Sequence, residues 1–233
     1  VRYDMRVRRI LHQCFGKQVV LFALFAFLPL EHASLEARSF PDIPTEAWYR
    51  EEVESFLVQG YLDPSQPTFR GNDRATRAEF VKLIVELSGG ILDDPPAKPS
   101  FSDVATADWF FPYMEEAVRE KWLKGDRDCY QDSKTPRFQD SKCFVRPHAP
   151  ILRAEAATLL SRAYGMKPLS RAPAFSDNPP GSWFSDAIQA TADHCILRGD
   201  DNTRSVRPAA FLNRAEMVVM LARVDEGRKY PEC

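Results

Sequence analysis

Three arginines of this chain lie in the same short motif and are candidates for binding an anion. The motif reads TRAE at residues 76–79, LRAE at 152–155 and NRAE at 213–216. Each copy opens an apolar-periodic stretch, which places Arg77, Arg153 and Arg214 in the first turn of a helix. The helix dipole disfavours a cation there by about 0.3 to 1 kcal/mol, so we expect an anion to compensate. Free backbone N–H groups at a helix start and a forked guanidinium group together could bind a carboxylate.

An aspartate and a tryptophan recur at a fixed spacing ahead of these motifs. The pattern is Phe-x-Asp with a Trp eight positions after the Phe, at Phe40, Asp42 and Trp48, at Phe101, Asp103 and Trp109, and at Phe175, Asp177 and Trp183. Each aspartate could instead neutralise the arginine of its own copy inside the protein, and the residues alone leave both alternatives open. Residue statistics favour a core-anchor role for the tryptophans, although an indole could also contact a sugar ring.

The glutamates of the motif are predicted to cap helices. Thr76 with Glu79, and the corresponding pair in the third copy, have the spacing of an N-cap residue and an acidic residue at the third helical position. Leu152 has no capping group in its side chain, so Glu155 must find other partners. Because capping accounts for these carboxylates, we expect no pair of catalytic acids among them.

Apolar residues after each Trp predict the first helix of each copy. They fall 5, 9 and 13 positions after the Trp, at Val53, Leu57 and Tyr61, at Met114, Val118 and Trp122, and at Ile188, Ala192 and Ile196. A second apolar series follows each Arg and predicts a second helix. The sequence therefore predicts an all-α chain built from three helix-loop-helix copies.

Glycine and proline clusters separate the copies. Gly89-Gly90 and the prolines at 95, 96 and 99 end the first copy, and Pro168 and Pro173 end the second. The expected segments are a signal peptide over 1–37, the first copy over 38–95, the second with its insertion over 96–170, and the third with the C-terminal tail over 171–233. Copies of this size cannot each bury the apolar faces of two helices, so we expect one common core.

The N-terminal segment has the features of a secretory signal peptide. Basic residues from Arg6 to Lys17 precede the apolar stretch Val19 to Leu30, and small residues follow at Ala33 and Ala37. The stretch is shorter than the roughly 20 residues of a membrane-spanning helix, so an uncleaved anchor is the weaker alternative. The exported part would be mildly acidic, which argues against electrostatic binding of nucleic acid.

Four cysteines follow the predicted signal, an even number that indicates disulfides in an exported chain. The second copy has the longest interval between its Trp and its Arg, and this insertion holds Cys129 and Cys143. A bridge between these two would leave Cys195 to pair with Cys233. The spacing does not decide the connectivity.

These motifs resemble the S-layer homology family over residues 40 to about 224. The repeat of that family has a Phe-x-Asp opening, a Trp at the first helix, a Gly after it, and Thr-Arg-Ala-Glu at the second helix. The resemblance implies an all-helical, pseudo-threefold single domain whose inter-repeat grooves bind secondary cell-wall polysaccharide, often through a pyruvate-ketal sugar. Gly125 and Gly199 match the family glycine, whereas Pro64 replaces it in the first copy. Because Leu152 also departs from the family pattern, the third copy is expected to hold the best site.

The expected site residues follow from the motifs and from this resemblance. The candidate carbohydrate-binding residues are Asp42, Trp48, Arg77, Asp103, Trp109, Gly125, Arg153, Asp177, Trp183, Gly199 and Arg214. The two glycines could instead end a helix with positive φ. We expect no cofactor and no metal site, because His148 and His194 lack metal-ligand spacing. Without a phosphate-binding loop or a Gly-x-Ser-x-Gly motif, we expect no enzyme.

The sequence predicts a secreted protein that is anchored non-covalently to the cell wall or cell surface. The expected partner is a cell-wall polysaccharide or a peptidoglycan-linked polymer. No nucleic acid and no membrane span after signal cleavage are expected. The alternative is a structural surface-layer protein that uses the same repeats for protein–protein contacts without binding glycan. An enzyme acting on wall glycans is a third and weaker hypothesis.

Overall fold

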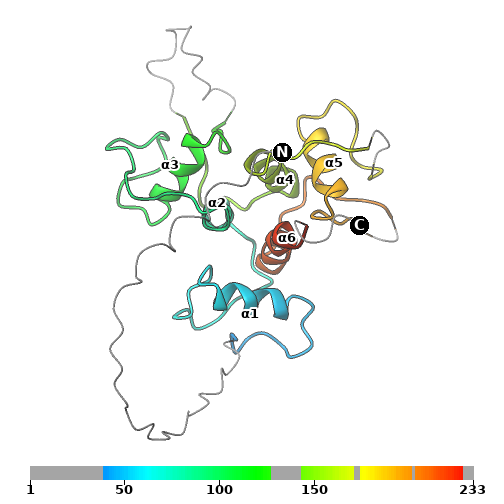
Figure 1. Cartoon of the computed structure of the whole chain (residues 1–233), viewed down its shortest axis with the longest axis horizontal. Helices are drawn as coiled ribbons and strands as arrows, with labels where there is room; N and C mark the ends of the chain where they lie inside the picture. Colours follow the sequence, from blue (N-terminus) through cyan, green and yellow to red (C-terminus); the bar gives the residue numbers. More distant parts are fainter. Residues whose placement is uncertain (1–38, 127–142, 171–173, 201–202, 228–233) are drawn as a thin grey trace, which may run out of the picture. The chain divides into compact units, whose positions relative to one another are not determined.

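The computed structural model describes residues 39–126, 143–170, 174–200 and 203–227 (Figure 1). The helices in these ranges are α1 (Arg50–Val58), α2 (Arg77–Leu87), α3 (Phe111–Arg119), α4 (Arg153–Ala163), α5 (Ser185–Asp193) and α6 (Arg214–Gly227). Apart from isolated β-bridges, the described residues form no strand, which confirms the prediction of an all-α chain. The signal peptide, Cys129 and Cys233 lie outside the described residues, so the signal and the disulfides stay predictions.

Each copy contributes one helix that begins two residues after its Trp and one that begins at its Arg. The capping prediction is confirmed at α2, where the Glu79 N–H donates to Thr76 Oγ1 over 3.2 Å and the Thr76 N–H donates to Glu79 Oε2 over 2.8 Å. The third copy has the same reciprocal pair. At α4 only one of the two hydrogen bonds forms, from the Leu152 N–H to Glu155 Oε2 over 3.0 Å, because the Leu152 side chain has no acceptor.

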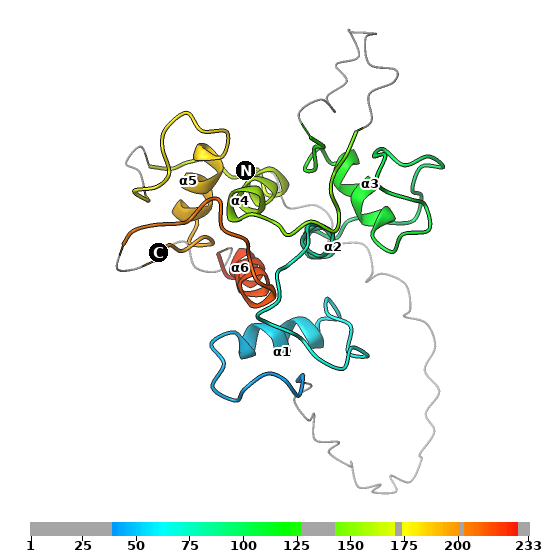
Figure 2. The same cartoon turned by 180° about the vertical axis from the view of Figure 1, so that it is seen from behind.

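The first helix of each copy packs against the second helix of a different copy. α3 lies against α2, α5 against α4, and α1 against α6. The contact between α1 and α6 joins the first and third copies, so the packing closes into a circle. Figures 1 and 2 show α2, α4 and α6 near the centre with α1, α3 and α5 around them. Side chains from all three copies form one buried cluster, including Val53, Phe80, Met114, Leu160, Ile188 and Leu221.

Backbone hydrogen bonds tie the three copies together just before the second helices. The Ala75 N–H donates to Leu212 O over 3.0 Å, the Leu212 N–H to Ile151 O over 3.0 Å, and the Ile151 N–H to Ala75 O over 2.9 Å. All three residues are buried. Because this triangle fixes the starts of α2, α4 and α6 relative to one another, it also fixes the residues of the repeated Arg motifs.

Candidate functional site

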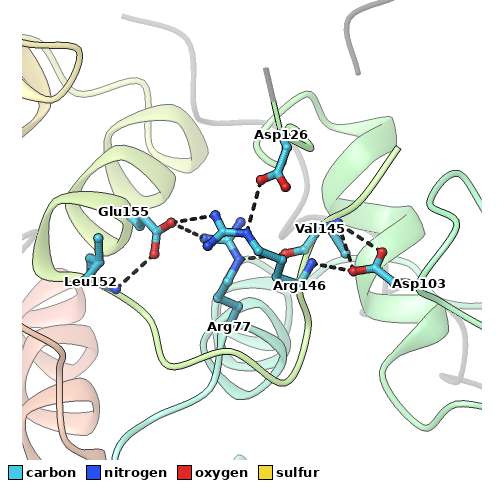
Figure 3. Close-up of polar contacts among 7 residues, drawn as sticks. All are labelled: Arg77, Asp103, Asp126, Val145, Arg146, Leu152 and Glu155. Carbon is cyan, nitrogen blue, oxygen red and sulfur yellow. Dashed lines mark hydrogen bonds and ion pairs between the residues drawn. The ribbon is translucent and has the colours of Figure 1, made fainter. Parts of the chain in front are cut away.

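The guanidinium group of Arg77 is buried and held by the second copy. Its Nε donates to Val145 O over 2.7 Å, and one of its terminal nitrogens lies 3.0 Å from Glu155 Oε1 (Figure 3). Only 6% of Arg77 is exposed. Burial lowers the pKa of this guanidinium, and the neighbouring Glu155 carboxylate opposes that shift. Arg77 is therefore a cation neutralised inside the protein.

The other two arginines repeat this arrangement around the molecule. Arg153 donates from Nε to Val206 O over 2.7 Å and lies 3.3 Å from Glu216 Oε1. Arg214 donates from Nε to Phe69 O over 2.8 Å and forms an ion pair with Glu79. Each arginine thus reaches the glutamate of the next copy, and the third copy reaches back to the first. We call this closed set of three pairs the Arg–Glu ring.

The backbone N–H groups at the starts of the second helices are also occupied. The Arg77 N–H donates to Ala149 O over 3.0 Å and the Ala78 N–H to Pro147 O over 2.9 Å. The corresponding loop carbonyls of the third and first copies accept from the starts of α4 and α6, respectively. The expectation of free N–H groups beside outward-facing arginines is therefore wrong, and it is most clearly wrong for Arg77 and Arg153, which are buried. The physical reason is that the loop of the next copy supplies the missing acceptors.

The aspartates of the Phe-x-Asp motif organise these loops. Asp42 accepts hydrogen bonds from the Phe69 and Arg70 N–H groups over 2.8 and 2.7 Å, and the second and third copies repeat this with Asp103 and Asp177. Burial opposes ionisation of Asp42, but the backbone donors outweigh it and hold its pKa below the usual range. The pKa of Asp177 is lowered in the same way, with a further hydrogen bond from Ser205. The Arg–Asp pair within one copy, the other open alternative, is also wrong.

In each of these loops, the second of the two residues whose N–H groups bind the aspartate is an arginine with positive φ. The φ values are 57° at Arg70, 54° at Arg146 and 53° at Arg207. Positive φ is unusual for a residue with a Cβ, and here the aspartate that accepts both loop N–H groups stabilises it. Sequence reasoning missed these arginines, although Phe-Arg-Gly at 69–71 and Val-Arg-Pro at 145–147 and 206–208 form a third recurring motif.

The three motif tryptophans lie on the surface. Trp48, Trp109 and Trp183 are 60%, 52% and 61% exposed, so the core-anchor interpretation is wrong. Each indole instead meets the ring of the next aromatic residue edge-on, at an interplanar angle of 84°. That next residue takes the inner position, as Phe110 does at 1% exposure. The exposed indoles leave a flat apolar face available to a ligand.

A groove of about 260 Å³ gathers residues from all three copies. Trp48 comes from the first copy, Arg153 from the second, and the remaining residues from the third. Its polar and glycine residues from the third copy are Arg198, Gly199, Asp200, Arg207, Glu216 and Arg223. Of the predicted site residues, the groove thus brings together Trp48, Arg153 and Gly199. We call it the third-copy groove.

The third-copy groove has more cationic than anionic side chains. Arg198 and Arg207 are exposed, and among the described residues neither side chain has a hydrogen-bond or ion-pair partner. Burial is the main cause that lowers the pKa of Arg153, and repulsion from the nearby Arg207 adds to it, while Glu216 and Asp177 oppose the shift. Two unpaired guanidinium groups beside an ion-paired third favour an anion in this groove.

Packing, and not the end of a helix, explains the glycine at position 199 of the groove. A Cβ at Gly199 would overlap the ring of Phe175. Positive φ occurs instead directly after the C-caps of the first helices, at Gly60, Lys121 and Cys195. Gly199 therefore permits close packing of the groove wall and does not end a helix.

In the part of the chain that the structure describes, no helix has the length and apolar character to span a membrane. No cluster of three or more His, Cys, Asp or Glu side chains suited to a metal ion occurs in the same residues.

Comparison with known proteins identifies relatives at the cell surface. No protein-family model matches the chain. It is 28% identical over 177 residues to a surface layer protein of Brevibacillus choshinensis, a match that covers 73% of this chain and 14% of that protein. It is 28% identical over 182 residues to a cellulosome-anchoring protein of Acetivibrio thermocellus, covering 76% of this chain and 36% of that protein. An amylopullulanase of Thermoanaerobacterium thermosulfurigenes is 27% identical over 194 residues, which are 79% of this chain and 9% of the enzyme.

The matches cover most of this chain but only a minor part of each relative. The relatives include surface-layer and anchoring proteins, which are not named as enzymes, as well as a protein named for its catalytic activity. The shared segment is therefore a part common to proteins of different kinds.

Proposed function

We propose that this chain attaches the protein that contains it to the cell envelope by holding an anionic cell-wall polysaccharide in the third-copy groove. The observation that carries the proposal is the exposed Trp48 indole beside the unpaired guanidinium groups of Arg198 and Arg207. An indole offers a flat face to a sugar ring, and a guanidinium binds a carboxylate or phosphate through two parallel hydrogen bonds. No bond is made or broken, so the function is binding.

The relatives support the cell surface as the place where this chain works. Surface-layer and cellulosome-anchoring proteins share this segment, and an amylopullulanase shares it over a small part of its length. A segment common to such different proteins is explained most simply by a common need for attachment. The predicted cell-surface localisation agrees with these relatives.

The proposed roles of the predicted site residues differ between ring and groove. Arg77 and Arg214 would hold the copies together, while Arg153 does so and also forms one wall of the groove. Asp42, Asp103 and Asp177 would act indirectly, by fixing the loops. Trp109, Trp183 and Gly125 lie outside the third-copy groove and have no role in the binding proposed here.

Retention on purified cell-wall sacculi tests the proposal. We expect the full chain to co-sediment saturably with sacculi of the producing organism, and Trp48→Ala to weaken this binding about tenfold or more, as loss of an aromatic anchor does at other interfaces. Trp109→Ala is the matched control, because that indole is equally accessible but lies outside the third-copy groove. Equal retention of both variants at the wild-type level would refute the role of the groove.

A structural surface-layer role is the second candidate. Surface layer proteins are among the relatives, and the indoles of Trp109 and Trp183 are exposed outside the groove. Self-association of the chain in sedimentation velocity runs, together with no retention on sacculi, would favour this candidate over polysaccharide binding.

A further inference from the structure

The third-copy groove has an excess of two positive charges. It contains four arginines, Arg153, Arg198, Arg207 and Arg223, and two carboxylates, Asp200 and Glu216. Glu216 is engaged with Arg153 in the Arg–Glu ring. Arg223 uses one terminal nitrogen to donate to Ile196 O over 3.4 Å. The uncompensated charge therefore lies mainly at Arg198 and Arg207.

At the corresponding positions of the first copy, acidic side chains outnumber basic ones. Counted from the helix ends and the loop motif, Asp63 stands in place of Arg198, and Glu86 stands in place of Arg223. Arg70 corresponds to Arg207, but it lies 3.7 Å from Asp73. In the third copy the position of Asp73 is occupied by Ala210, which offers no carboxylate. The second copy has cations at the same three positions, Lys124, Arg146 and Arg162, but its loop arginine Arg146 forms ion pairs with Asp126 and Glu155. A loop arginine without an ion-pair partner is thus a property of the third copy and not a requirement of the fold.

Like charges that converge on a small groove without a counter-charge are unfavourable in the unliganded protein. A ligand with one negative charge would relieve only one of the two unpaired guanidinium groups. A ligand with two negative charges in the same groove would satisfy both, and each charge could accept a forked hydrogen-bond pair.

We infer that the third-copy groove selects a saccharide group with two negative charges, and that Arg198 and Arg207 are the residues that determine this specificity. The inference rests on the proposed function and adds the charge of the ligand. The chemistry is that of a phosphate monoester on a sugar, or of two acidic groups within the length of the groove. A sugar with a single carboxylate would bind more weakly.

Titration calorimetry of the full chain with three simple probes tests this charge requirement. The probes are glucose 6-phosphate, which carries two negative charges at pH 8 because the second phosphate pKa is about 6, glucuronic acid with one charge, and neutral glucose. We expect glucose 6-phosphate to bind about tenfold more tightly than glucuronic acid. Arg198→Gln and Arg207→Gln should each remove most of this preference and leave the affinity for glucuronic acid within about threefold of the wild type.

Arg70→Gln is the matched control, because it makes the same change at the corresponding positive-φ position of the first copy. It should leave the preference intact. Equal affinity of the wild type for both charged probes, or a loss of preference in Arg70→Gln, would overturn the inference. If neither charged probe binds, both probes are used as competitors for retention on sacculi at equal concentration, and equal competition would overturn it as well.

The sacculus experiment separates this inference from the proposed function. Retention that depends on Trp48 but shows no preference for the doubly charged competitor leaves envelope attachment in place and removes the charge requirement. Absence of retention removes the proposed function itself.

Discussion

The first and third copies have the same loop backbone but differ in the charged side chains around the loop arginine. In both, an aspartate accepts two loop N–H groups, and the arginine of the loop has a φ close to 55°. In the third copy Arg207 borders an open groove beside Gly199. In the first copy Arg70 faces Asp73, and Pro64 occupies the position of the glycine. Residues that build the fold and residues that present charge are therefore separable in this molecule.

In the first copy, a network of polar contacts lies beside α2, at the position that corresponds to the third-copy groove. The Lys82 Nζ donates to Glu86 over 2.7 Å and to Tyr61 O over 2.8 Å, and the Tyr113 hydroxyl donates to Glu86 over 3.0 Å. Burial, together with the Glu86 carboxylate, raises the pKa of Tyr113 to about 12, so the hydroxyl remains a donor at neutral pH. Lys82 is thus paired with Glu86, as Arg70 is with Asp73, so these two cations of the first copy are already neutralised by carboxylates.

Removing an arginine of the Arg–Glu ring should have the largest effect of the predicted changes, and the effect should be on stability. Arg77→Met removes a buried cation of the Arg–Glu ring and leaves Val145 O without its donor. We expect the free energy of unfolding to fall by about 3 kcal/mol, as when one partner of a buried ion pair is removed. Urea unfolding followed by circular dichroism measures the change.

Arg70→Gln is the control for that experiment, because Arg70 belongs to an exposed pair with both side chains 58% accessible. Its effect should be below about 0.5 kcal/mol. A similar loss of stability in both variants would mean that the Arg–Glu ring is no more important than a surface pair.

Converting the third copy toward the first should weaken binding with little change in stability. Ala210→Asp gives Arg207 the carboxylate that Arg70 already has in Asp73. We expect affinity for sacculi to fall about threefold to tenfold, because the ligand must now displace an internal ion pair. The reverse change Asp73→Ala should not create binding, since Asp63 and Pro64 remain. Unchanged affinity in Ala210→Asp would show that the charge of Arg207 is not used.

The smallest expected effect concerns the loop aspartates and pH. Asp177 has a lowered pKa in the folded chain, so its contribution to stability is complete above its unfolded pKa and is lost as the pH falls through the folded value. Asp177→Asn should reduce the free energy of unfolding by about 1 kcal/mol at pH 7. The difference from wild type should shrink as the pH falls below about 4. A difference that is constant from pH 7 to pH 3 would exclude this role of the carboxylate.

The sequence was sufficient to predict where each helix lies, the caps and the exception at Leu152. Those features depend on residues a few positions apart, and Glu155 indeed finds other partners, in Arg77 and Arg146 (Figure 3). The predicted apolar stripe was too long, because α1, α3 and α5 end before Tyr61, Trp122 and Ile196. The partners of the arginines could not be predicted, because Arg77 reaches Val145 and Arg214 reaches Glu79 across different copies. Three equal motifs do not indicate whether a side chain meets its own copy or the next.

The exposure of the tryptophans was missed for a related reason. In each copy two aromatic residues are adjacent, as in Trp109 and Phe110, and the helical pattern does not say which of them turns inward. Contacts with residues far along the chain decide it, because Tyr49 packs on Phe69 and Phe110 on His148. Phe110 is buried, and Tyr49 and Phe184 are half-buried. Arg207 of the groove could have been found from the third recurring motif, since an arginine occupies its second position in all three copies, whereas Arg198 lies outside that motif.

The most direct test of the third-copy groove is to observe its tryptophan during binding. The chain has four tryptophans, so a ¹⁵N-labelled sample gives four indole N–H signals, which single Trp→Phe variants assign. We expect soluble fragments of the cell-wall polysaccharide to shift the Trp48 signal in a saturable manner and to leave those of Trp109 and Trp183 in place. Shifts confined to Trp109 or Trp183, or no shift at saturating fragment, would contradict the assignment of binding to this groove.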